Sequence, residues 1–101
     1  MITNEQLLEM LDTGLQSDDY EDLPTRMLPG LYGYVIHGIP PGDFLTAVIT
    51  NDLVGAIVLA DDQNLSMLPI WVKFFCSCVE PTGASGSLAK MNRWILSRRQ
   101  G

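Results

Sequence analysis

The sequence predicts a single all-α domain, a compact bundle of about five or six short helices over residues 1–101. The length suits one domain, and 47% apolar residues are enough for a core of its own. Apolar residues also recur at helical spacing in one segment after another, and prolines, glycines and aspartates separate these segments. We expect an acidic N-terminal helix and linker over residues 1–23 and the core helices over residues 24–101.

Residues 4–16 are expected to form the first helix. Thr3 or Asn4 can cap it, because a short side-chain oxygen accepts hydrogen bonds from unpaired backbone N–H groups. The linker after it, residues 17–23, carries four carboxylates within five positions, with Tyr20 among them. Tyr20 either anchors a partner or packs onto the core. The apolar stripe of the first helix comprises Leu7, Leu8, Leu11 and Leu15.

A second helix is predicted over residues 24–37. Pro24 or Pro29 can occupy its first turn, where the missing N–H has no cost. Tyr34 lies off the apolar face and is expected to be partly exposed. Gly38 stands just past the end, where helices commonly stop in a left-handed backbone conformation. The residues expected to face inward are Leu28, Leu31, Tyr32, Val35 and Ile36.

The strongest helical pattern covers residues 43–61, after the extended turn that Pro40-Pro41 imposes. Thr50-Asn51-Asp52 is a plausible second cap, so the segment forms either one bent helix or two short ones. Val54, Val58 and Leu59 lie off its main stripe, and a helix that is apolar on most sides is either central or presents a face to a partner. Asp61-Asp62-Gln63-Asn64 is expected to end the helix. The main stripe comprises Phe44, Leu45, Val48, Ile49, Leu53, Ala56, Ile57 and Ala60.

Two more helices are expected in the last third. Ser66 can cap the first, with Pro69 in its first turn; this start favours a helix over a buried strand for the dense apolar run at residues 70–79. A loop follows at residues 80–86. Ser87 can cap the last helix, residues 88–99, whose apolar stripe comprises Leu88, Met91, Trp94 and Ile95, with Leu96 beside it.

The net charge of −6 is unevenly spread. Residues 1–50 contain eight acids and one base, whereas residues 51–101 contain four acids and five bases. An acidic half keeps a small protein in solution, repels nucleic-acid phosphates and attracts basic surfaces. The bases of the last helix make only a short patch, so no direct nucleic-acid binding is expected: Lys90, Arg93, Arg98 and Arg99. No secretory signal or membrane-length apolar run is visible, which indicates a cytoplasmic protein with no membrane partner.

The sequence contains no catalytic, cofactor or metal motif. We therefore expect no enzyme activity, no cofactor, no metal and no small-molecule substrate. The one histidine, His37, ends a helix, where the dipole favours it without any catalytic role. Cys76 and Cys78 are too closely spaced on a helix for an internal disulfide and are expected to be buried free thiols. A nucleophilic pair would need His37 beside one of them, and a zinc site would lack a fourth ligand.

One stretch carries a family resemblance. Residues 38–49 read Gly-Ile-Pro-Pro-Gly-Asp-Phe-Leu-Thr-Ala-Val-Ile, followed by Asn51-Asp52-Leu53, Ala56, Ala60-Asp61 and Asn64. This pattern resembles a group of small bacteriophage and prophage proteins without an assigned activity, and the likeness spans residues 28–95. The resemblance implies a mobile-element origin and a helical fold. Residues 54–59 and 74–78 are more apolar than the pattern, which favours an acquired apolar contact surface.

These features together predict a protein that acts by binding. We expect a phage-encoded inhibitor of a host protein or ribonucleoprotein complex, comparable with anti-CRISPR proteins, that occupies a basic or nucleic-acid-binding surface. The alternative is a self-associating phage accessory or structural domain, in which residues 54–59 pair two copies as a homodimer. The predicted partner-binding residues are the apolar anchors Tyr20, Tyr34, Val54 and Val58 and the acids Asp18, Asp19, Glu21 and Asp22.

Overall fold

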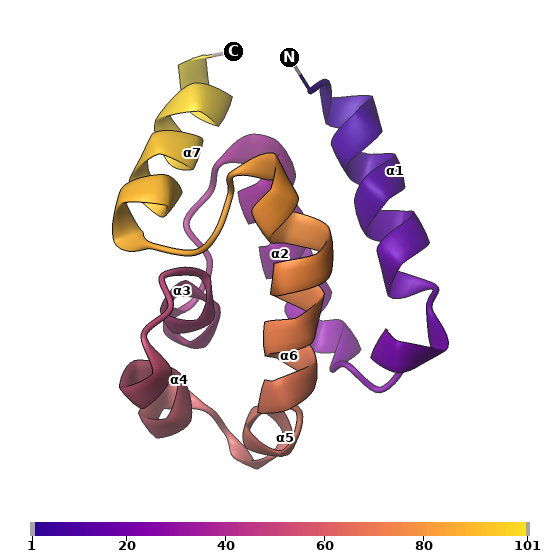
Figure 1. Cartoon of the computed structure of the whole chain (residues 1–101), viewed down its shortest axis with the longest axis vertical. Helices are drawn as coiled ribbons and strands as arrows, with labels where there is room; N and C mark the ends of the chain where they lie inside the picture. Colours follow the sequence, from indigo (N-terminus) through magenta and orange to yellow (C-terminus); the bar gives the residue numbers. More distant parts are fainter. Residues whose placement is uncertain (1, 101) are drawn as a thin grey trace.

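The computed structural model describes residues 2–100 and confirms the all-α class, with no strand in that range. Short 3-10 turns at Asp18–Tyr20 (η1), Thr25–Met27 (η2) and Glu80–Thr82 (η4) join or extend the helices, and the π-helical segment Phe75–Val79 (η3) continues α6. The seven α-helices are α1 (Asn4–Leu15), α2 (Leu28–His37), α3 (Asp43–Ile49), α4 (Leu53–Leu59), α5 (Asp62–Ser66), α6 (Leu68–Phe74) and α7 (Leu88–Gln100) (Figure 1).

Helix α1 begins with a capping box. The Thr3 hydroxyl accepts a hydrogen bond from the backbone N–H of Gln6, and the Gln6 side chain accepts one from the backbone N–H of Thr3. Leu7 and Leu11 are fully buried and pack α1 against α2, whereas Leu8 of the expected stripe is exposed. The Tyr32 hydroxyl donates to the Asp12 carboxylate, and burial together with this contact raises the pKa of Tyr32 to about 12.

The segment 43–66 divides into three helices, which explains why there is one helix more than expected. Asn51 adopts a left-handed conformation with φ of +67° and ends α3, and the Asp52 carboxylate then caps α4 by accepting from the N–H of Gly55 at 2.9 Å. The helix ends just before Asp61, with Ala60 in an extended conformation, but residues 61–64 also begin a further helix that the sequence did not predict. The Asp61 carboxylate accepts from the N–H of Asn64 at 2.8 Å and begins α5.

An aromatic cluster fills the centre of the molecule. Trp71 on α6 is fully buried, with its ring centroid 6.3 Å from that of Phe44 on α3 and 6.2 Å from that of Phe75. Its indole N–H donates to the side-chain oxygen of buried Asn64 on α5 at 3.1 Å. This satisfied polar contact orients the ring inside an apolar core. One side chain thus joins α3, α5 and α6, and the cap of α6 falls on Met67 rather than Ser66.

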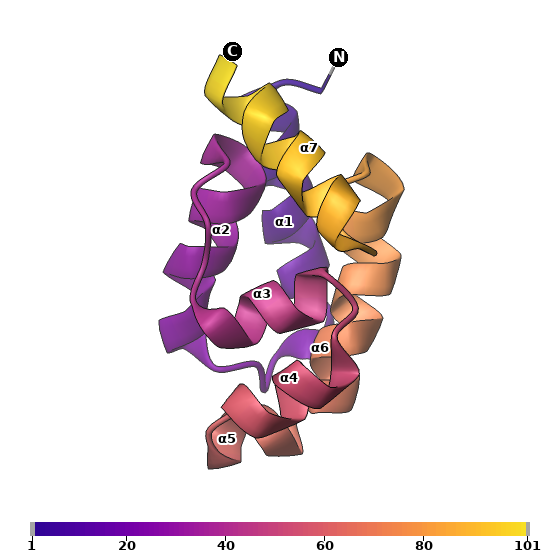
Figure 2. The same ribbon diagram turned by 90° about the vertical axis from the view of Figure 1, so that its left-hand side faces the viewer.

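Helix α7 closes the bundle by hydrogen-bonding to the end of α2 (Figure 2). The indole N–H of Trp94 donates to the carbonyl of Val35 at 3.0 Å, and the guanidinium of Arg98 donates to the carbonyl of Ile36 at 2.9 Å. The last carbonyls of a helix have no partner within it, so these side chains satisfy them. Arg98 also donates to the backbone carbonyl of Ile2, which brings the two ends of the described chain together.

Glycine is required at position 38, between α2 and α3, for two separate reasons. Its φ of +68° is left-handed, and a Cβ there would stand 2.8 Å from the Cβ of Arg98 and 3.0 Å from the carbonyl oxygen of Ile95. The left-handed conformation allows the α2 end to turn, and the missing side chain allows α7 to approach. The expected left-handed stop at Gly38 is therefore confirmed.

We predict that Gly38→Ala lowers the free energy of unfolding by about 2–5 kcal/mol, from left-handed strain plus overpacking against α7. Gly83→Ala is the matched control, because Gly83 has a φ of +91° and a Cβ added there would meet no atom within 4 Å. We expect this control to lose only about 1–2 kcal/mol, the strain alone. Urea unfolding followed by circular dichroism measures both. Equal losses would show that the close approach of α7 contributes nothing.

Candidate functional site

The candidate site is an exposed apolar helix. Leu53 is 63%, Val54 73%, Ile57 46% and Val58 73% exposed, and Leu59 is half exposed as well. Residues three and four positions apart lie side by side on a helix, so Leu53, Val54, Ile57 and Val58 form one continuous exposed face. We refer to Leu53, Val54, Ile57 and Val58 as the α4 face. Ala56 alone is buried in α4, so the interpretation in which this helix lies centrally is wrong.

The α4 face results from the two anchored helices on either side. Helix α3 is anchored in the core by Phe44 and Ile49, and α5 is anchored by the hydrogen bond between Asn64 and Trp71. The seven residues of α4 connect these two anchored helices across the surface. An exposed patch of this kind is a feature of interaction sites. Full burial of each large side chain contributes roughly 1.5–3 kcal/mol, so a partner that covers the α4 face gains binding free energy from all four.

The surroundings of the α4 face are acidic. Residues 27–72 contain no lysine or arginine, and they contain Asp43, Asp52, Asp61 and Asp62. Among the described residues the one ion pair joins Asp61 to Arg26. The Asn64 N–H bound to the Asp61 carboxylate, aided by Arg26, holds its pKa below the usual value, so this carboxylate is ionised at neutral pH.

A groove separates the α3–α4 pair from α6. One depression of about 200 Å³ is lined mainly by apolar groups of α3, α4 and α6, including Leu53, Leu68 and Val72. A smaller one of about 80 Å³ continues past Phe75 and Cys76. The two depressions share Val48, Asn51 and Val72, and therefore adjoin each other beside the α4 face; together they are the groove.

The acidic linker lies apart from the α4 face. Asp18, Asp19, Glu21 and Asp22 are exposed, at and after η1, and in Figure 1 they and α4 lie on opposite sides of α6. Tyr20 is half buried, and its ring meets that of Phe74 edge-on at a centroid distance of 5.2 Å. Tyr20 thus packs onto the core, one of the two alternatives considered. A role of these acids in binding stays a prediction.

Tyr34 is not a surface anchor. The prediction that it is partly exposed is wrong, because its side chain is fully buried and its hydroxyl donates to the carbonyl of Ala84. Burial raises the pKa of the phenol above its ordinary value. Helix α2 lies between α1 and α7, so side chains on more than one of its faces enter the core. Val54 and Val58, in contrast, are fully available on the surface.

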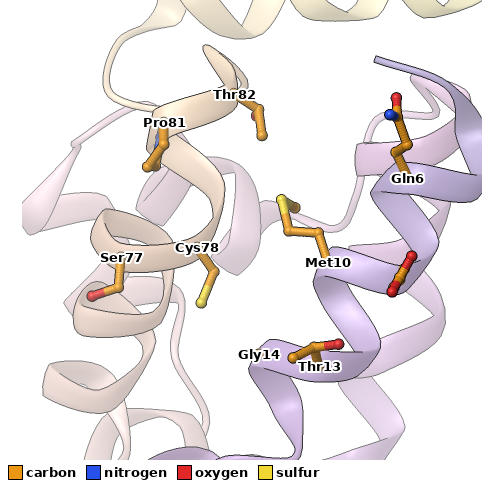
Figure 3. Close-up of a pocket in the computed structure, with 9 residues that line it drawn as sticks. Gln6, Met10, Thr13, Gly14, Ser77, Cys78, Pro81 and Thr82 are labelled. Carbon is orange, nitrogen blue, oxygen red and sulfur yellow. The ribbon is translucent and has the colours of Figure 1, made fainter.

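The histidine and the cysteines are not brought together. His37 lines a hollow of about 530 Å³ between α1 and α2, whereas Cys78 lines another of about 600 Å³ between α1 and the segment 77–82. Figure 3 shows the Cys78 and Met10 side chains facing each other across this second hollow. Both cysteines are free, and the expectation of burial is wrong for Cys76, which is exposed. Within residues 2–100, no cluster of potential metal ligands occurs.

The hollow at Cys78 offers no activated nucleophile. Burial raises the pKa of the Cys78 thiol, and neither a histidine nor a lysine or arginine lines the hollow. The basic patch predicted on α7 is also weaker than its composition suggests, because Arg98 is occupied with the carbonyl of Ile36 and the side chain of Asn4. Of the apolar anchors predicted from the sequence, Val54 and Val58 of the α4 face are the ones that the fold leaves exposed, whereas Tyr20 and Tyr34 pack into the molecule.

Comparisons with protein-family models, with curated proteins and with solved structures gave no match for this chain. Over the described residues, none of the helices combines the length and the apolar character needed to cross a bilayer. The geometry and the charge of the site are therefore the basis for assigning it a role.

The two thiols are predicted to differ in reactivity. Iodoacetamide at pH 8 is expected to alkylate Cys76 in the folded protein at least about tenfold faster than Cys78, because Cys78 is half buried and burial raises its pKa. Both cysteines lie in the tryptic peptide 74–90, so fragmentation of this peptide by tandem mass spectrometry over time gives both rates, and Cys76→Ser isolates the slower one. Fast modification of Cys78 in that variant would show that its thiol is activated, which contradicts this prediction and supports an enzymatic role for Cys78.

Proposed function

We propose that this chain is a phage-encoded protein that binds and inhibits a host protein complex by occupying a basic surface. The observation that carries the proposal is the exposed α4 face. Four large apolar side chains there contact solvent on a helix whose surroundings hold aspartates, with no lysine or arginine from residue 27 to residue 72. Apolar anchors within a charged rim are the usual composition of a protein-binding hot spot.

Charge favours a foreign partner over a second copy. Asp52 precedes α4 and Asp61-Asp62 follow it, and Arg26 pairs with Asp61, so each end of the helix keeps one carboxylate outside an ion pair. Two copies paired through α4, in either orientation, place carboxylate against carboxylate, which opposes association. A partner with lysines or arginines around an apolar cleft meets the same rim with opposite charge. Nucleic-acid-binding complexes offer such surfaces, which supports an anti-defence role for a protein of mobile-element origin.

The alternative is a self-associating accessory domain. The size of the α4 face favours it, because burial of these side chains against the same face of a second copy removes as much apolar surface from water as burial against a partner. The two proposals differ in salt dependence. Binding to a basic partner weakens as salt rises, whereas a homodimer with facing carboxylates strengthens, because screening reduces attraction in the first case and repulsion in the second.

Val54→Asp is predicted to abolish partner binding and leave the fold intact. Val54 lies in the first turn of α4, where a negative charge suits the helix dipole, so the free energy of unfolding changes by about 0.5 kcal/mol or less. Leu88→Asp is the matched control: Leu88 is the first residue of α7 and is also exposed, and no residue of α7 lines the groove beside α4.

The measurement is affinity capture from host lysate at low and moderate salt, followed by a nucleic-acid-binding assay of the captured complex. The wild-type protein and Leu88→Asp should capture the same complex and reduce its nucleic-acid binding, and Val54→Asp should do neither. Capture that Val54→Asp retains, or a captured complex whose binding is unaffected, contradicts the proposal. A dimer in light scattering that strengthens with salt and is lost in Val54→Asp supports the alternative.

A further inference from the structure

The groove beside α4 is long enough for about two turns of a partner helix. Along α6 and its π-helical continuation, Leu68, Val72 and Phe75-Cys76 line it in succession, at positions i, i+4 and i+7 to i+8. That stripe runs about 12 Å along the helix, since each residue rises about 1.5 Å. A partner helix presents side chains at the same intervals over about two turns.

The opposite wall favours side-chain anchors over a small molecule. It is built from Ala47, Val48, Leu53 and Ala56, so two alanines leave room while larger groups stand at the rim. The two depressions measure about 200 and about 80 Å³. Each is below the roughly 300 Å³ at which small-molecule pockets begin. Volumes of this size accommodate single apolar side chains projecting from a macromolecule.

The charges around the groove select the flanks of that helix. Asp52 lines the larger depression and Glu80 the smaller, and no lysine, arginine or histidine lines either one. The ammonium of Lys90 approaches Gly86 at the Glu80 end, so the acidic character is strongest at the α4 end. There Asp52 lines the groove and Asp62 follows α4, while Asp61 is paired with Arg26. A helix with lysine or arginine on both sides of its apolar stripe complements this arrangement, and an acidic or neutral one does not.

We propose that the groove between α3–α4 and α6 binds an amphipathic helix of the partner that carries basic residues on its flanks. This inference rests on the proposed function and specifies its partner. Leu53 belongs to both the groove and the α4 face, so the bound helix lies against one side of α4 and leaves Val54 and Val58 for the remainder of the partner surface. A second copy of this chain is the competing occupant, because α7 keeps Arg93, Leu96 and Arg99 exposed although Arg98 binds α2, and the sedimentation measurement below tests it.

The test uses ¹⁵N-labelled protein and two designed helical peptides of about 18 residues, or five turns. One has leucines on one face and lysines on the other, and the matched control replaces each lysine by glutamate. The lysine peptide should shift the amide signals of Val48, Asn51, Leu53, Val72 and Cys76. It should bind at least about tenfold more tightly than the glutamate peptide and weaken as salt rises.

Val72→Asp should reduce the affinity for the lysine peptide by at least about tenfold, and Leu88→Asp should leave it unchanged. Cys76→Glu is the second groove variant, used where thermal unfolding shows that Val72→Asp lowers stability. Signals that shift elsewhere, equal binding of both peptides, or no shift at about 1 mM peptide overturn the proposal. So does a dimer, seen by sedimentation, that Val72→Asp dissociates.

The two proposals fail separately. If Val54→Asp abolishes capture and inhibition of the host complex while Val72→Asp retains both, the function stands and the groove is not the helix site. If the lysine peptide occupies the groove but the captured complex keeps its nucleic-acid binding, the groove stands and the inhibitory function is wrong.

Discussion

The fold depends on the burial of Trp71. This one side chain contacts Phe44 of α3, continues into Phe75 and donates its N–H to Asn64 of α5, so the segments before and after α4 are both held at the centre. In a closed core no water can take the place of Asn64 as the partner of the indole N–H. The hydrogen bond therefore fixes the position of α5 relative to α6. Helix α4 is then a seven-residue bridge between two fixed points. Its exposure follows from the packing of its neighbours.

The sequence predicted the elements better than it predicted their burial. Gly38, Ser87, Asp52 and the prolines marked helix ends because caps and stops depend on local backbone chemistry. Periodicity also placed Leu53 and Ile57 in the same stripe as Phe44 and Val48, yet these two lie outside the core. The left-handed turn at Asn51 redirects the chain, so the helical phase of α3 does not carry over into α4. The prediction for Tyr34 was wrong in the opposite sense: it was expected to be partly exposed and is buried, because α1 and α7 cover two sides of α2.

The charges show the same limit. Composition correctly gave an acidic protein, but only the fold determines which charges remain available. Arg26 neutralises Asp61, and Arg98 is consumed in holding α7 against α2, so bases that are distant in sequence serve the structure. The acidic linker and the α4 face, which the sequence combines into one site, lie on opposite sides of α6 (Figure 1). The α4 face therefore takes its acidic rim from Asp52 and Asp62, with Asp61 paired to Arg26, rather than from residues 18–22.

The residues of α4 divide by what constrains them. Asp52 caps the helix, a Cβ on Gly55 would fall 2.3 Å from the Asp52 carboxylate and displace that cap, and Ala56 faces the core. Each of these has a reason inside the monomer. The α4 face has none, because side chains that contact water in both the folded and the unfolded chain contribute little to folding, and polar residues would serve equally well there. Four exposed apolar side chains beside a groove with apolar walls and an acidic edge are therefore the basis of the proposal that a partner surface covers them.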